Sequence, residues 1–224
     1  GVANFTFIET VLDGPEAYLT GLSDLDILWD GGQARLYATT SFSGGTSVFD
    51  IGTNLDVVDR QGAGSGTGLG DVAEIERIEL NGQDVMVRIG QPSSGLEGHV
   101  INGNGSLGSA RSIDAPGSHS LAALEVIERN GEQILVTSTV DGSGLTSWVL
   151  DGTDMVQRDT VNFGTSGDGI DIPALAHLEV GGDTYVLAVS ASDNALSSFR
   201  LNSNGDMQLR ATVEAYSGLG IAVP

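Results

Sequence analysis

The chain alternates short runs of apolar and polar residues with glycine-rich turns, and this pattern occurs four times. Each copy opens with an alternating run that ends at a tight turn, at 22–32, 75–82, 124–131 and 175–182. The glycines that close these turns recur about every 50 residues, at Gly32, Gly82, Gly131 and Gly182. A regular period of this length predicts a propeller or a solenoid before any residue chemistry is considered.

The third copy shows how each repeat divides into four strands. Its first run, 124–129, is followed by Asn130-Gly131, and an Asn-Gly pair between alternating runs is a strong hairpin signal. Three further runs follow, at 133–140, 146–150 and 155–161. The other copies divide in the same way, and no stretch has a helical period of useful length.

Four antiparallel strands per repeat predict an all-β fold, a β-propeller with four complete four-stranded blades of about 50 residues each. The alternative is a stack of β-sandwich modules. It would need about seven strands and about 100 residues per module, so the repeat favours the propeller. We treat 1–224 as a single propeller segment whose predicted blades are 22–61, 71–113, 121–161 and 171–213.

The two ends of the sequence also resemble parts of the repeat, but neither end completes a blade. Residues 5–11 resemble the fourth strand of a preceding blade, and 214–224 resemble the start of a following one. We therefore expect four blades of a larger ring of about six to eight blades, with a closed four-bladed ring as the alternative. On this interpretation the ring is completed by further blades or by another chain, because exposed edge strands invite pairing.

The composition narrows the range of partners. The 224 residues carry a formal net charge of −21, and all nine basic residues are arginine. A field this negative repels nucleic acid and anionic lipid, so we expect neither as a partner. No apolar run is long enough to cross a membrane, and there is no cysteine for disulfides or thiol chemistry. The acidic residues are interpreted as a solvated surface, with cation binding as the alternative.

Two segments resemble a known repeat family. The repeat of bacterial lactonase-type (YVTN-like) propellers is similar to Leu196-Ser-Ser-Phe-Arg-Leu-Asn-Ser-Asn-Gly-Asp-Met-Gln-Leu and to Leu145-Thr-Ser-Trp-Val-Leu-Asp-Gly-Thr-Asp-Met-Val. The whole chain also resembles propeller regions of large secreted calcium-binding bacterial proteins of the RTX type. This resemblance implies a propeller fold and an extracellular or cell-surface location in a bacterium. The Gly-Gly-x-Gly-x-Asp calcium repeats of RTX proteins do not occur in this sequence.

The links between blades carry the candidate ligand-binding residues. In a propeller, the links between blades and the turns between second and third strands emerge on one face, where ligands usually bind near the axis. This places Asp71, His119, Asp168 and Asp171 at the axial mouth, with Asp71 and Asp171 as candidate metal ligands. Calcium prefers about six to eight oxygen ligands, so such a ring could hold it. The same groups could supply acid–base chemistry, or could be turn residues that bond their own backbone and face water.

Other residues at repeat spacing are expected to be structural. Aromatic residues recur on the predicted third strands, at Phe49, Trp148 and Phe199, with Val100 at or near the same place in the second copy. We expect them in the core between blades rather than as a platform for stacking sugars. His177 is expected to pack in a blade interface or the channel, with one hydrogen bond.

The sequence favours a non-catalytic role. Nothing resembles a nucleophile elbow or a Ser-His-Asp series, and no repeat carries an unusual cluster of reactive groups. We therefore expect an interaction or structural module of a secreted or cell-surface bacterial protein, with a protein or glycan partner. The alternative is a lactonase-like hydrolase with a divalent cation at the axial mouth. Propellers host both binders and enzymes, so the fold alone does not decide between them.

Overall fold

The computed structural model describes residues 7, 9–15, 17–30, 32–40, 45–61, 72–90, 96–113, 121–139, 144–162, 172, 174–190 and 194–214. Every regular element in these ranges is a β-strand, and they contain no helix long and apolar enough to cross a membrane. In chain order the strands are β1 (Leu22–Asp30), β2 (Gln33–Thr40), β3 (Thr46–Ile51), β4 (Leu55–Gln61), β5 (Val72–Leu80), β6 (Gln83–Gly90), β7 (Leu96–Ile101), β8 (Leu107–Ile113), β9 (Leu121–Arg129), β10 (Glu132–Thr139), β11 (Gly144–Asp151), β12 (Asp154–Asn162), β13 (Ala174–Val180), β14 (Asp183–Ser190), β15 (Ala195–Leu201) and β16 (Met207–Glu214).

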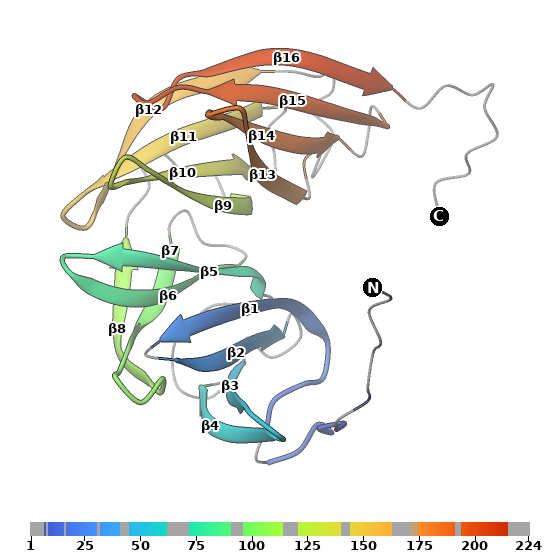
Figure 1. Ribbon diagram of the computed structural model, residues 1–224, viewed down its shortest axis with the longest axis vertical. Helices are drawn as coiled ribbons and strands as arrows, with labels where there is room; N and C mark the ends of the chain where they lie inside the picture. The colour runs from blue at the N-terminus through green and yellow to red at the C-terminus, as the bar shows by residue number, and fades with distance from the viewer. Residues whose placement is uncertain are drawn as a thin grey trace.

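The strands form four antiparallel sheets arranged as a four-bladed β-propeller (Figure 1). Consecutive strands make each sheet, so β1–β4 form blade 1, β5–β8 blade 2, β9–β12 blade 3 and β13–β16 blade 4. The prediction of an all-β fold with four four-stranded blades is confirmed. Asn81 and Asn130 open the first hairpins of blades 2 and 3 with φ of 53°, and glycines with positive φ follow them, as a type I′ turn requires.

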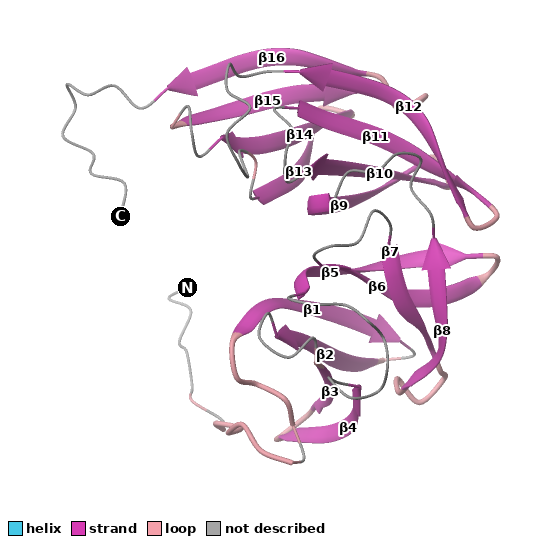
Figure 2. Ribbon diagram, turned by 180° about the vertical axis from the view of Figure 1, so that it is seen from behind, coloured by secondary structure: helices cyan, strands magenta, loops and turns pink. Residues whose placement is uncertain are grey.

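The blades follow one another in an arc, with the first strand of each blade innermost (Figures 1 and 2). Strand β1 contacts β5, β5 contacts β9, and β9 contacts β13. Within the described ranges, no contact of comparable extent joins β13 back to β1. Blade 1 and blade 4 are therefore the two ends of the arc.

Each interior junction contains an apolar core. We call the side of a blade that packs on the next blade its forward face, and the opposite side its backward face. The cores join Tyr37 and Val48 to Ile75 and Met86 at the first junction, Ile78 and Val87 to Leu124 and Leu135 at the second, and Ile127 and Val136 to Val186 and Phe199 at the third.

The outer strands are hydrogen-bonded to each other at the first and third junctions. A carboxylate oxygen of Asp59 accepts the amide of Leu107 at 2.8 Å, and one of Asp159 accepts the amide of Met207 at 2.8 Å. Arg111 occupies the equivalent position of blade 2, and its guanidinium bonds to groups of its own blade. Strand β4 contacts β8 and β12 contacts β16, but no comparable contact joins β8 to β12 in the described residues.

The turns between the third and fourth strands of blades 2 and 4 are also hydrogen-bonded to the preceding blade. The hydroxyl of Tyr37 donates to the carbonyl of Gly105 at 2.9 Å, and that of Ser147 donates to the carbonyl of Gly205 at 2.6 Å. Both glycines have positive φ, and a Cβ on either would collide with an arginine side chain of the preceding blade. Blades 1 and 3 are thus of one type, and blades 2 and 4 of another.

The N-terminal segment, described at 9–15 and 17–20, packs on the backward face of blade 1, over β2, β3 and β4. Glu9 accepts the amide of Leu55 at 2.9 Å, and Ala17 is buried in a cluster with Ala38 and Phe49. Residues 9–11, within the predicted strand 5–11, form no strand here. Residues 215–224, predicted to begin another blade, lie outside the described ranges.

Candidate functional site

The innermost strands carry acidic side chains on their forward faces, and we treat this inner-strand cluster as the candidate site. Its carboxyl groups come from three blades: Asp24 and Asp26 on β1, Glu74 and Glu76 on β5, and Glu125 on β9. They stand at alternate positions along their strands, and successive side chains of a strand point to opposite faces. The cluster therefore lies along the inner edge of the junctions between blades.

Three of these carboxylates bridge neighbouring blades. Asp24 accepts the amide of Ile75 at 3.0 Å, and Glu74 accepts the amide of Leu124 at 2.6 Å. Oε1 of Glu125 lies 2.5 Å from Nδ1 of His177 on β13. His177 therefore sits at a blade interface with a hydrogen-bond partner, as predicted, but its side chain is exposed rather than packed. These contacts tie each inner strand to the next one.

Two carboxyl groups of the cluster hold protons near neutral pH. Burial raises the pKa of Glu74 to about 7, although the hydrogen bond from the amide of Leu124 opposes this rise. Burial raises the pKa of Glu76 to about 8, and the nearby carboxylates of Asp26 and Glu125 add to the effect. Burial also raises the pKa of Asp26. Groups that are partly protonated at neutral pH are suited to proton transfer, so the cluster has the acidity that general acid–base chemistry needs.

The predicted axial-mouth residues cannot be placed beside this cluster. Asp71, His119, Asp168 and Asp171 all lie outside the described residues, so their roles in ligand and calcium binding stay predictions. Among the residues that the structure describes, no group of three or more His, Asp or Glu side chains is arranged to hold a metal ion.

The aromatic residues at repeat spacing are core residues. Phe49, Trp148 and Phe199 are at most 5% exposed. Trp148 and Phe199 pack between blades, as expected, whereas Phe49 packs against Ala17 of the N-terminal segment. The second copy differs from the prediction, because His99 rather than Val100 shares their position. His99 pairs with Met86 on the backward face, whereas Val100 packs in the core that joins blades 2 and 3. Side chains alternate along a strand, so a one-residue shift in alignment moves a side chain to the opposite face.

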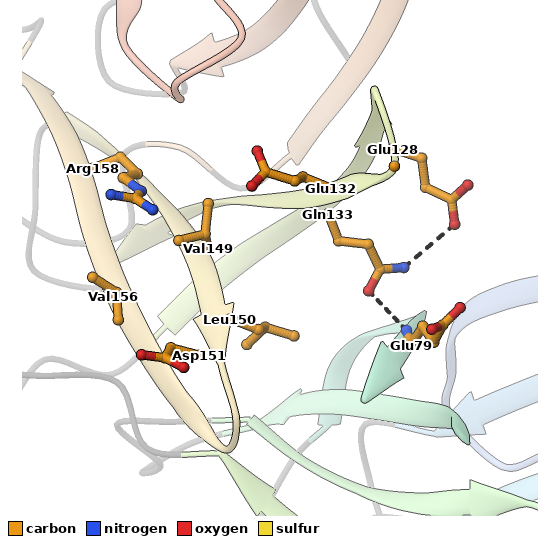
Figure 3. Close-up of a pocket in the computed structure, with 10 residues that line it drawn as sticks. Glu79, Glu128, Glu132, Gln133, Val149, Leu150, Asp151, Val156 and Arg158 are labelled. Carbon is orange, nitrogen blue, oxygen red and sulfur yellow. Dashed lines mark hydrogen bonds between the residues drawn. The ribbon is translucent and has the colours of Figure 1, made fainter. Parts of the chain in front are cut away.

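An open pocket of about 660 Å³ lies beside the second junction (Figure 3). The amide side chain of Gln133 lies on one side of it, accepting from the backbone of Glu79 at 2.8 Å and donating to the carboxylate of Glu128 at 3.4 Å. Aliphatic and charged groups of blade 3 line the other side, at Val149, Leu150, Asp151, Val156 and Arg158. Since its polar bridge already joins two blades, we interpret the pocket as part of the junction.

The polar members of the alternating runs are a sequence signal for the inner-strand cluster. The apolar members of these runs predict the strands, and the polar members show a second regularity. Asp24 and Asp26 in the first copy and Glu74 and Glu76 in the second occur at the same distances from the turn glycines. That coincidence places four carboxyl groups on equivalent faces of the innermost strands.

Solved structures share the propeller fold. A 6-phosphogluconolactonase-like protein from Bacteroides fragilis matches with 16% identity and a TM-score of 0.62, over 88% of this chain and 57% of that chain. An exo-β-1,3-galactanase from Phanerochaete chrysosporium matches with 12% identity and a TM-score of 0.65, over 92% of this chain and 52% of that chain. The major allergen Mala s 1 of Malassezia sympodialis matches with 11% identity and a TM-score of 0.58, over 86% of this chain and 63% of that chain.

These likenesses concern the fold. Lactonase-like propellers are among the structures with this fold, whereas the RTX context stays a prediction. The chain spans 52–63% of the length of these three structures. No protein-family model and no curated protein matches the sequence.

Proposed function

We propose that the chain is a non-catalytic interaction and structural module of a secreted or cell-surface bacterial protein, contributing four blades to a larger propeller. The observation that carries this proposal is the use of the inner-strand carboxylates as bridges. Asp24 and Glu74 accept backbone amides of the following blade, and Glu125 pairs with His177. Groups engaged in this way stabilise the arrangement of blades. The partners that fit the module are a protein or a glycan, together with the blades or chain that complete the ring.

A lactonase-like hydrolase is the second candidate, and the acidity of Glu74 and Glu76 favours it. Two carboxyl groups with pKa values of about 7 and about 8 could exchange protons with a substrate at neutral pH. The similar solved structures include a 6-phosphogluconolactonase-like protein and a galactanase. In this alternative a divalent cation, calcium, binds at the axial mouth through Asp71 and Asp171, with His119 and Asp168 nearby.

Hydrolysis assays separate the two candidates. The chain would be incubated with glucono-δ-lactone and with β-1,3-galactotriose, and compared with variants Glu74→Gln and Glu76→Gln. The module proposal expects the wild-type chain to give only the uncatalysed rate. Turnover by the wild type that both variants lose, while their folding is retained, would instead establish the hydrolase.

Thermal melting tests the cation independently. The module proposal expects the same melting temperature in calcium and in chelator. A resident calcium ion would raise the melting temperature by several degrees, since a ligand that binds only the native state stabilises it. In that case the double variant Asp71→Ala, Asp171→Ala should lose the shift, and a retained shift would place the ion elsewhere.

A further inference from the structure

The N-terminal segment covers blade 1 at positions that receive the preceding blade elsewhere in the arc. Ala17 is 1% exposed and packs with Ala38 and Phe49, and Leu36 is partly buried against the same cluster. At the positions of Leu36 and Phe49 in the repeat, blades 3 and 4 carry residues that pack under the preceding blade, namely Leu135 and Trp148, and Val186 and Phe199. The segment therefore buries the part of blade 1 that a neighbouring blade would bury.

The segment also supplies the hydrogen bond that holds an outer strand. A carboxylate oxygen of Glu9 accepts the amide of Leu55, the first residue of β4, at 2.9 Å. At the third junction the equivalent amide, that of Met207 at the start of β16, is accepted by Asp159 of the preceding blade, and the first junction has the same bond. Blade 1 is thus held at its outer strand as blades 2 and 4 are, with the N-terminal segment in place of a blade.

The sequence explains why Glu9 makes this bond. Glu9 is the fifth residue of 5–11, which resembles a fourth strand, and Asp159 is the fifth residue of the predicted fourth strand 155–161. The same two residue types, threonine and valine, follow both carboxylates. The segment therefore carries the outer-strand carboxylate of a blade, and this group reaches blade 1 although 9–11 form no strand here.

The backbone of the segment is also bonded to blade 1. The amide of Tyr18 donates to the hydroxyl of Ser47 on β3 at 2.8 Å, and this hydroxyl donates to the carbonyl of Tyr18 at 3.3 Å. The guanidinium of Arg60 on β4 lies 5.9 Å from the centre of the Tyr18 ring, within the range of a cation–π interaction. These contacts fix the segment across the third and fourth strands of blade 1.

We propose that the N-terminal segment is an intramolecular cover that takes the place of a preceding blade and closes this face of blade 1 to any other blade. A further blade would need the positions of Ala38 and Phe49 for its apolar core and the amide of Leu55 for its outer bond, and the segment occupies all three. A blade can therefore join here only after the segment has left. The proposal rests on the proposed role as a module that assembles with further blades, because the cover controls one end of that assembly.

A single engineered thiol tests whether the face is closed. The chain has no cysteine, so Ala38→Cys places the only thiol beneath the segment, and Ala176→Cys places one on an exposed strand of blade 4 as the reference. Iodoacetamide should modify Ala38→Cys at least about tenfold more slowly than Ala176→Cys, because the segment must open first. Adding Ala17→Asp should remove most of this protection, since a charge in the apolar cluster releases the segment. Adding Leu12→Asp, at an exposed position of the same segment, is the matched control and should leave the protection unchanged.

Hydrogen exchange at the amide of Leu55 tests the outer bond. Glu9→Ala should raise this exchange rate at least about tenfold, because the amide loses its charged acceptor. Asp56→Ala is the matched control, since it removes an exposed carboxylate next to Leu55 that does not accept the amide. The amides of β10 in blade 3 should stay protected in every variant, which would show that the chain remains folded.

Three results would overturn the proposal. Iodoacetamide could modify Ala38→Cys as fast as Ala176→Cys, which would mean that the face is open in solution. Ala17→Asp could leave the thiol protected, or Glu9→Ala could change the exchange of Leu55 no more than its control does. Turnover of glucono-δ-lactone would overturn the module function without changing any of these rates, so the two failures are distinguishable.

Discussion

The junction between blades 2 and 3 differs from the two junctions that flank it. At the first and third junctions, Asp59 and Asp159 tie outer strands together, and Tyr37 and Ser147 bond to the turns of the next blade. At the second, the outer strands are not joined in this way among the described residues, and a large apolar core connects the blades. A pair of blades, rather than a single blade, is therefore the structural unit.

The largest effect should come from the apolar core of the second junction. Leu124→Ala should lower the free energy of unfolding by about 2–4 kcal/mol, because it opens a cavity in a well-packed site. Leu25→Ala, at the same position of the repeat on an exposed face, should cost less than about 0.5 kcal/mol. Chemical denaturation of dilute protein measures both. Equal losses would show that blade 1 is covered in the isolated chain.

The same junction should make stability depend on pH. Because folding raises the pKa of Glu76 from 4.5 to about 8, the folded state binds the proton of this carboxyl group more tightly than the unfolded state does. The contribution of this proton to stability is complete below pH 4.5. This contribution is lost as the pH rises through about 8, and Glu74 acts in the same direction with a folded pKa of about 7.

Glu76→Gln should therefore stabilise the protein at pH 8 by on the order of 2 kcal/mol. Each pKa unit is worth about 1.4 kcal/mol, and partial exposure to water reduces the full value. Denaturation curves at pH 5 and pH 8 provide the measurement, with Glu132→Gln, an exposed residue of β10, as the control. An unchanged pH dependence in Glu76→Gln would contradict the assigned acidity.

At the first and third junctions, removing the carboxylate that joins the outer strands should have a smaller effect on the free energy of unfolding. Asp159→Ala leaves the amide of Met207 without its charged acceptor and should cost about 1–2 kcal/mol. Arg111→Ala changes the equivalent position of blade 2, where the side chain bonds within its own blade, and should cost less than about 0.5 kcal/mol. Hydrogen exchange at the amide of Met207 should increase in Asp159→Ala alone. Similar losses for both variants would remove the distinction between the junctions.

The smallest effect should separate two turn glycines. Gly205 and Gly152 both have positive φ, so alanine is strained at either position. A Cβ at Gly205 would also come within 2.9 Å of Arg158, whereas a Cβ at Gly152 would have nothing within 4 Å. Gly205→Ala should therefore lower the melting temperature more than Gly152→Ala does, by a difference of about 1 kcal/mol in stability. A reversed order would mean that Arg158 moves aside freely.

The sequence was sufficient to predict the blades because they depend on local signals. The hairpin at Asn130-Gly131 and the alternation of apolar residues determine strands and turns within one copy. The other three copies repeat the same pattern, so they form the same strands. The junctions depend instead on which face each side chain takes. Asp24 and Asp159 look like ordinary polar residues of alternating strands until the packing of neighbouring blades brings amides to them. The error at Val100 had the same origin, a register that only cross-strand pairing defines.

The missing outer ties at the second junction leave a different kind of contact to hold it. The inner strands β5 and β9 stay in contact there, and the apolar core between the blades includes Ile113 of β8 and Met155 of β12. The first and third junctions are fixed by hydrogen bonds, which have a preferred direction. The placement of one pair of blades against the other therefore depends on apolar contact that has no preferred direction.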